Sequence, residues 1–120
     1  MTDLTLKQQS FVQDNIPMRL RNLAAHLVQI QSLLNDATLF DKAVSLIRES
    51  RYFIEWTAQE MDIDDAAELV ELGRALTRWL FNWEKIWSDA TARMKVTQEA
   101  GTWSERMLDM SGLSRETVSQ

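Results

Sequence analysis

The chain contains no cysteine, and this absence excludes several kinds of site at once. Disulfide bridges, thiolate metal sites and cysteine nucleophiles all need a thiol. A chain without cysteine is also typical of a reducing compartment. We therefore expect a cytoplasmic protein that is stabilised by its core rather than by covalent cross-links.

Glycine and proline are scarce as well, with three glycines and one proline in 120 residues. So few chain breakers favour long helices with short connections, and no phosphate-cradling glycine loop is present. The first residues do not follow a signal-peptide pattern, and no apolar run approaches the roughly 20 residues that cross a bilayer. We expect no membrane insertion.

Basic charge is also limited, because the net charge is −5 and residues 61–90 hold seven acidic but three basic side chains. Binding of nucleic acid usually needs a basic stripe that displaces counterions from the phosphates. The middle of this chain would repel a polyanion. We therefore expect no nucleic-acid partner.

What the sequence does contain is helical periodicity, with apolar residues alternating at spacings of three and four. Pro17 marks a helix start, because proline is favoured in the first helical turn. The pattern predicts helices over 17–34, 36–61, from 62 to a boundary at Ser88-Asp89, and from there to Ser111. A restart or kink is expected near Gly101, because Thr102-Trp-Ser-Glu105 matches a capping box.

Connections this short force neighbouring helices to run antiparallel. The predicted fold is therefore all-α, an up-down antiparallel four-helix bundle with a short N-terminal helical segment. The predicted organisation is an N-terminal segment over 1–16, a single bundle domain over 17–112 and a frayed tail over 113–120.

Trp79, Trp83 and Trp87 stand four residues apart and fall within about 80° on one helical face. Aromatic residues at this spacing are typical of a core, and they can also line a pocket for an apolar ligand between helices. Gly73 on the same side suggests a close helix crossing. The predicted core comprises Leu27, Ile47, Ile54, Leu76, Trp79, Trp83, Trp87 and Trp103.

A second group of large side chains lies opposite these apolar stripes. Exposed Tyr and Trp cost solubility and are enriched at protein interfaces. Either residues 1–16 fold back over this group or a partner chain covers it; alternatively, the two central helices are simply buried on two sides. The predicted interface comprises Tyr52, Trp56, Phe81 and Val70 with the cations Arg48, Arg74 and Arg78.

The inventory for catalysis and metal binding is short. His26 is the single histidine, too few for a bundle-core di-iron site. The cluster Asp62-Ile-Asp64-Asp65 lacks the glycine and the distal glutamate of a calcium loop and suits a helix N-terminus. We expect no metal, no cofactor and no enzymatic activity.

The stretch Arg21-Asn-Leu-Ala-Ala-His26 resembles the Arg-polar-x-x-x-His signature of HEPN-type ribonucleases, which are small helical bundles. The resemblance implies that Arg21 and His26 act together on RNA. Five residues turn a helix through 500°, which leaves the two side chains about 140° apart if the helix continues to Leu34. The ribonuclease hypothesis therefore requires the helix to end near His26.

Two longer segments, Leu46-Ile-Arg-Glu-Ser-Arg-Tyr-Phe-Ile-Glu-Trp-Thr57 and Trp103-Ser-Glu-Arg-Met-Leu-Asp-Met-Ser-Gly-Leu113, are similar to those of small helical proteins encoded in cyanobacterial genomes. This resemblance implies a source but no activity.

The sequence favours a non-catalytic interaction module, acting as an adaptor, assembly or regulatory protein. Its expected partner is another protein, first of all a second copy in a homo-oligomer. The alternatives are the HEPN-like ribonuclease, and a carrier of an apolar ligand between the third and fourth predicted helices.

Overall fold

The structure is a computed structural model that describes residues 2–35 and 39–112, with their side chains from residue 6 onward. Helices account for 89% of the described residues, and these residues contain no strand. The predicted all-helical class is therefore confirmed. The helices are α1 Thr2–Gln13, α2 Ile16–Leu33, α3 Phe40–Ala58, α4 Ile63–Phe81, α5 Trp83–Ser88 and α6 Ala90–Ser111.

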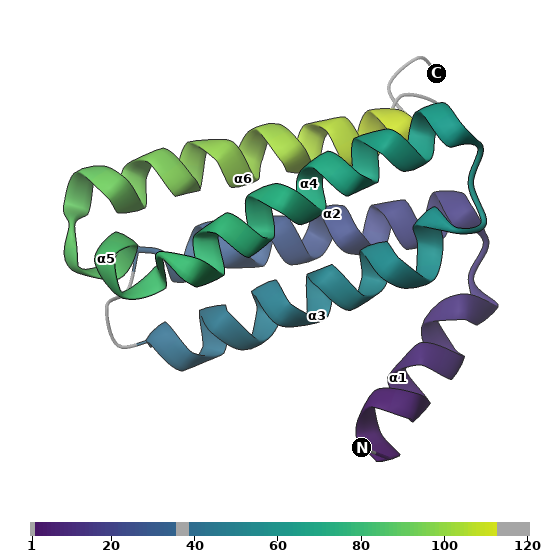
Figure 1. Ribbon diagram of the computed structural model, residues 1–120, viewed down its shortest axis with the longest axis horizontal. Coiled ribbons are helices and arrows are strands. Elements are labelled where there is room, and N and C mark those ends of the chain that lie inside the picture. The colour runs from purple at the N-terminus through teal and green to yellow at the C-terminus, as the bar shows by residue number, and fades with distance from the viewer. Residues whose placement is uncertain (1, 36–38, 113–120) are drawn as a thin grey trace.

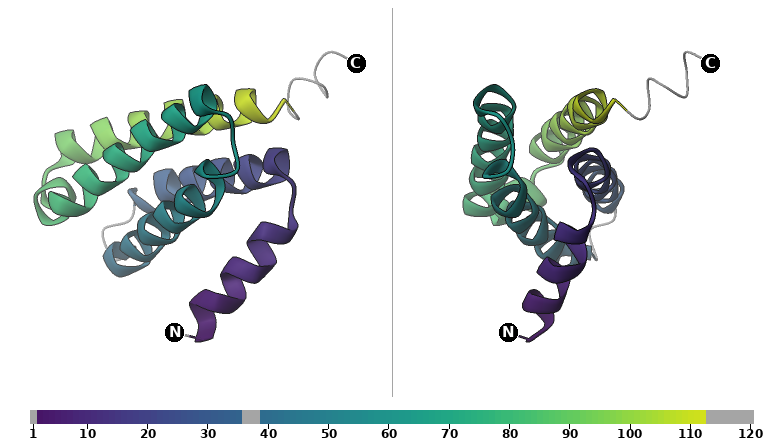
Figure 2. Two further views of the ribbon diagram at one scale, coloured as in Figure 1. Left: turned by 45° about the vertical axis from the view of Figure 1, so that its right-hand side comes forward. Right: turned by 90° about the vertical axis from the view of Figure 1, so that its right-hand side faces the viewer.

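The four longest helices lie side by side, and the short helix α5 joins α4 to α6 (Figure 1). Helix α2 packs along α6, and α3 packs against both α2 and α4. Helices α4 and α6 make less contact with each other than these pairs do. Helix α1 leaves the group at an angle, as both views in Figure 2 show, and it contacts α3.

Several helix ends follow the capping chemistry expected of the sequence. Asn15 lies one residue before α2, and its side chain accepts a hydrogen bond from the Met18 amide. Pro17 lies in the first turn of α2. Asp62 caps α4 and Asp89 caps α6 in the same way. Gly112 ends α6 with a φ of 73°, which glycine adopts without strain. The predicted boundary at Ser88-Asp89 is therefore a true break between helices.

Two of the predicted boundaries are wrong, and a third lies outside the described residues. That third one is the start of the second long helix at residue 36; the described helix begins at Phe40, and the residue before it makes no capping hydrogen bond through its side chain. The expected third helix is divided at Asn82, whose side chain donates to the Arg78 carbonyl at 3.0 Å. Helix α6 runs unbroken through Gly101, so the expected restart there does not occur. The predicted tail over 113–120 lies outside the described residues.

Gly101 allows a close approach between α2 and α6. The Gln31 amide donates to the Thr97 carbonyl at 3.0 Å, and a Cβ added to Gly101 would lie 2.7 Å from the same Gln31 nitrogen. Ser104 donates to the Ala24 carbonyl at 3.1 Å farther along this contact. Small residues let the two backbones approach, so the capping-box pattern beginning at Thr102 is overridden by packing.

The core collects one face of each long helix. Six of the eight predicted core residues are buried, and Trp87 and Trp103 are half-buried against them. The tryptophan stripe continues across the break, because Trp79 ends α4 while Trp83 and Trp87 belong to α5. Phe40 of α3 packs edge-on against the last two, with ring centroids 6.1 and 5.5 Å apart. The buried predicted residues are Leu27, Ile47, Ile54, Leu76, Trp79 and Trp83.

Replacing Gly73 with alanine is expected to raise the free energy of unfolding by about 0.5–1 kcal/mol, since glycine in a helix interior is less favourable than alanine. The added Cβ would lie 3.9 Å from Ile54 Cγ2, an ordinary contact, so the crossing of α3 and α4 does not require glycine. Urea denaturation measures the change. Gly101→Ala is the matched control, because the gain in helix propensity is offset there by displacement of Gln31. A loss of stability for Gly73→Ala would contradict the prediction.

Candidate interaction surface

The outward face of α4 carries the two most exposed large apolar side chains in the described part of the chain. Ile63 is 84% exposed at the start of the helix, and Phe81 is 89% exposed at its end. Val70 lies between them and is 45% exposed. Two of these three, Val70 and Phe81, belong to the predicted interface, whereas Ile63 was assigned only to the acidic cap. Large apolar groups left in water at both ends of one helix mark this face as a candidate contact surface.

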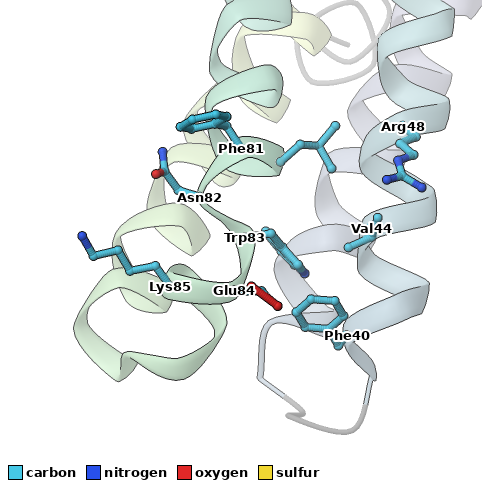
Figure 3. Close-up of a pocket in the computed structure, with 9 residues that line it drawn as sticks. Phe40, Val44, Arg48, Phe81, Asn82, Trp83, Glu84 and Lys85 are labelled. Carbon is cyan, nitrogen blue, oxygen red and sulfur yellow. The ribbon is translucent and has the colours of Figure 1, made fainter.

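A groove of 440 Å³ separates the start of α3 from the junction of α4 and α5 (Figure 3). Phe40, Val44 and Trp83 supply apolar walls, and Arg48 reaches toward the groove from α3. Phe81 stands at its opposite rim. The structure therefore brings Arg48 and Phe81 to one groove, although they lie 33 positions apart in the sequence.

A second groove, of 460 Å³, follows the same α3–α4 boundary farther along. Val70, Gly73 and Arg74 of α4 face Arg51 and Glu55 of α3 across it. The lining is mixed, with charges of both signs beside apolar carbon. Together the two grooves place four of the seven predicted interface residues, Arg48, Val70, Arg74 and Phe81, along one boundary.

A third groove, of 510 Å³, lies on the other side of α4, between α4 and α6. Its lining is dominated by charged and polar groups from both helices, among them Arg74, Arg78, Lys95, Glu99 and Arg106. Arg78 pairs with Glu99 at 3.5 Å, and the guanidinium of Arg106 lies 4.7 Å from the Trp103 ring centroid. This charged lining suits a polar partner surface better than an apolar ligand.

Trp56 is covered within the chain, so it does not belong to an open interface. It is 8% exposed, because α1 folds back and places Phe11 against it with ring centroids 5.9 Å apart. Phe11 also stacks on Phe53 at 4.1 Å. Of the two covers predicted for this group, residues 1–16 rather than a partner chain supply the cover of Trp56. Tyr52 is 39% exposed and stacks on Trp56 at 5.7 Å, at the edge of the α1 contact.

Arg19 holds this arrangement together and was missed in the sequence. It is 4% exposed, and its guanidinium donates to the carbonyl oxygens of Val12 and Asp14 at 2.8 and 2.9 Å. It also reaches the Trp56 carbonyl at 3.3 Å and the Glu60 carboxylate at 3.0 Å. One side chain thus joins the end of α1, the turn before α2 and the end of α3. Arg19 lies two residues after Pro17, and nothing in the sequence indicated its burial, because an arginine near a helix start is ordinarily expected to be exposed to solvent.

His26 lies in a polar cleft of 330 Å³ between α1, α2 and α3. Its Nε2 is 2.7 Å from a Glu49 carboxylate oxygen, and its Nδ1 is 3.2 Å from the Asn22 carbonyl oxygen. Both neighbours accept hydrogen bonds, so both bonds form together when each ring nitrogen carries a proton. Lys7 of α1 completes the cluster through an ion pair with Glu49.

Burial of Glu49 would raise the pKa of its carboxyl, but hydrogen bonds from Lys7 and His26, together with their charges, outweigh it and hold the pKa below its ordinary value. Glu49 is therefore an anion that both Lys7 and His26 contact. The His26 ring also packs edge-on against Phe53 at 4.7 Å. The cluster joins α1 and α2 to α3, and each nitrogen of the histidine already has a partner within the chain.

The geometric condition of the ribonuclease hypothesis is not met. Helix α2 continues past His26 to Leu33, and Arg21 is exposed on it. On an unbroken helix these side chains diverge by about 140°. His26 turns instead toward Glu49 of α3. The structure therefore does not bring Arg21 and His26 together.

Metal binding and membrane spanning can be examined in residues 2–35 and 39–112. No group of three or more His, Asp or Glu side chains there could hold a metal ion. None of the helices in these ranges combines the length and apolar character needed to cross a bilayer. The acidic residues around Asp62 act at the start of α4, where Asp62 accepts from the Asp65 amide at 3.2 Å.

Comparison with known proteins adds no relative: no protein-family model, curated protein or solved structure gives a significant match to this chain. Function has to be inferred from the surface itself.

Proposed function

We propose that this chain is a non-catalytic protein-interaction module that binds another protein surface through the outward face of α4. In this proposal the four long helices form an up-down bundle that serves as a rigid scaffold for that face. The adaptor, assembly or regulatory role, the cytoplasmic location and the cyanobacterial source belong to the same proposal.

The observation that carries the proposal is the exposure of Phe81 and Ile63, at 89% and 84%. The core offers buried positions on every long helix, yet these two large apolar groups remain in water. Burying one such side chain contributes about 1.5–3 kcal/mol. Arg74 and Arg78 belong to the same half of α4 as Phe81, and arginine next to exposed apolar groups is typical of binding surfaces.

The two alternatives receive less support. The ribonuclease hypothesis requires Arg21 beside His26, and both nitrogens of that histidine are engaged by Asn22 and Glu49. The carrier hypothesis requires an apolar cavity between the third and fourth predicted helices, which correspond to α4 with α5 and to α6. The groove found between α4 and α6 is lined by charged groups such as Arg78, Glu99 and Arg106.

Replacing Phe81 with serine is expected to reduce capture of the partner by roughly tenfold or more, because an apolar side chain lost from a contact costs more than 1.4 kcal/mol. The measurement is quantitative recovery of cross-linked proteins with the tagged chain from its native cells. Copies of the chain itself count among the recovered proteins.

Met94→Ser provides the matched control, because Met94 is 63% exposed and belongs to α6 rather than to α4. Recovery should be unchanged for this variant. Equal recovery with Phe81→Ser and wild type, or no specific partner for any of the three, would remove the proposal.

A further inference from the structure

Six residues of α4 form a continuous stripe along its outward face. Their spacings are four, three, four, three and four, which is the pattern of a coiled-coil seam. The first and last, Ile63 and Phe81, are 18 residues apart, or five full turns and about 27 Å. All six are exposed in the structure: Ile63, Ala67, Val70, Arg74, Thr77 and Phe81.

This stripe is additional to the face that α4 turns toward the core. The core face carries Leu69, Leu72 and Leu76, each 0% exposed. Helix α4 therefore has two faces that carry apolar residues, and only one of them is buried within the chain. The second face has its large apolar groups at the ends, with Val70 and Arg74 in the middle.

Charge along one flank of the stripe changes sign from the start of α4 to its end. Asp64, Glu71 and Arg78 follow each other at intervals of seven residues, so they lie in one row. The start of the helix is acidic: the charge of Asp62, together with those of Asp64 and Glu68, raises the pKa of Asp65. Arg74 and Arg78 make the second half basic. A surface that complements this row has to be basic at one end and acidic at the other.

A second copy of α4 in the reversed orientation meets that requirement. We propose that the partner is a second copy of this chain, bound through α4 in antiparallel orientation about a twofold axis near its middle. Ile63 then packs on the second copy's Phe81, and Asp64 faces the second copy's Arg78. Both contacts occur twice because the axis makes the interface self-complementary.

The charges at the centre of the interface also balance. Arg74 already pairs with Glu71 at 2.9 Å within one chain. Two such pairs meet at the axis and form a neutral group of four charges. A parallel arrangement would instead place the acidic starts of the two helices beside each other and their basic ends beside each other, which costs energy at both ends. Charge therefore selects the antiparallel pair. This inference rests on the proposed function and names its partner.

The first experiment is a charge exchange measured by sedimentation equilibrium at low salt. Asp64→Lys and Arg78→Glu each turn two attractive contacts into repulsive ones, so each variant alone should dimerise at least tenfold more weakly than wild type. Mixed in equal amounts they restore both contacts, and the mixture should return to within about threefold of the wild-type dissociation constant. Both positions are exposed, so unchanged helical circular dichroism is the control for folding.

The second experiment tests orientation and uses the absence of cysteine in the natural chain. Under mild oxidation, a mixture of Ile63→Cys and Phe81→Cys chains should form a disulfide-linked pair. Neither variant alone should do so. Efficient linking of Phe81→Cys to itself would overturn the antiparallel arrangement.

A wild-type chain that stays monomeric at the highest soluble concentration, or a mixture no stronger than its single variants, would also overturn the inference. If capture from native cells still depends on Phe81 in that case, the proposed function stands and the partner is a different protein with an acidic and a basic end. Loss of both results would remove the inference and the function together.

Discussion

Replacing Arg19 with methionine is expected to lower the free energy of unfolding by about 2–4 kcal/mol, since removal of a buried guanidinium leaves its partners unsatisfied. Three backbone carbonyls, those of Val12, Asp14 and Trp56, lose their donor. The Glu60 carboxylate loses its ion pair, but its side chain is 49% exposed, so water compensates for much of that part. Urea denaturation followed by circular dichroism gives the change.

The same substitution should loosen α1, because Arg19 joins the end of that helix to α3. Amide hydrogen exchange in α1 and around Trp56 should increase more than exchange in the contact between α2 and α6. Arg19→Lys should recover only part of the loss, because an ammonium group cannot reproduce the planar fork of donors. Glu60→Gln, which keeps every carbonyl contact, should cost less than about 1 kcal/mol. A loss as large for Glu60→Gln as for Arg19→Met would show that the ion pair, not the carbonyl network, stabilises this junction.

Replacing Trp83 with alanine is expected to cost about 3–5 kcal/mol, the range for truncating a large buried aromatic side chain. Trp83 is 3% exposed and packs against Phe40 and Trp87, with ring centroids 6.1 and 5.4 Å away. These contacts join α3 to α5 just after the break at Asn82. Loss of the ring would therefore leave a cavity where the chain changes direction. Chemical denaturation with two-state analysis measures the effect.

Two further variants separate packing from polarity at this position. The Nε1–H of Trp83 is buried and has no acceptor in the described part of the chain, so Trp83→Phe removes an unsatisfied donor along with some volume. Its cost should stay below about 2 kcal/mol. Trp87→Ala should also cost less than Trp83→Ala, because Trp87 is half-buried. Equal losses for all three variants would contradict the assignment of Trp83 as the packed centre.

The sequence predicted the long helices more fully than the junctions between them. Periodicity located the long helices and the buried residues such as Leu27, Ile47 and Leu76, because burial repeats with the helical turn. Pro17 located the start of α2, and Ser88-Asp89 located the break before α6. The break at Asn82 was missed, because apolar periodicity continues unchanged through Trp79, Trp83 and Trp87 while the backbone bends.

The candidate surface was predicted in part. Phe81 and Val70 were recognised, since they oppose the core stripe of their own helix. Trp56 also lies opposite the core stripe of its helix, but the sequence of α3 alone could not predict that Phe11 covers it. Ile63 was overlooked within the acidic cap, although its distance of five turns from Phe81 was available in the sequence.

The sequence by itself determined the all-helical class, the caps at Asn15, Asp62 and Asp89, and the inward face of each helix. These features depend on neighbours within about one or two turns. Which outward face remains in water depends on contacts between residues far apart, such as Arg19 with Trp56 and Phe11 with Phe53. Only the tertiary structure decided that α1 covers Trp56 and leaves α4 open, because burial of a second face is a property of packing between helices.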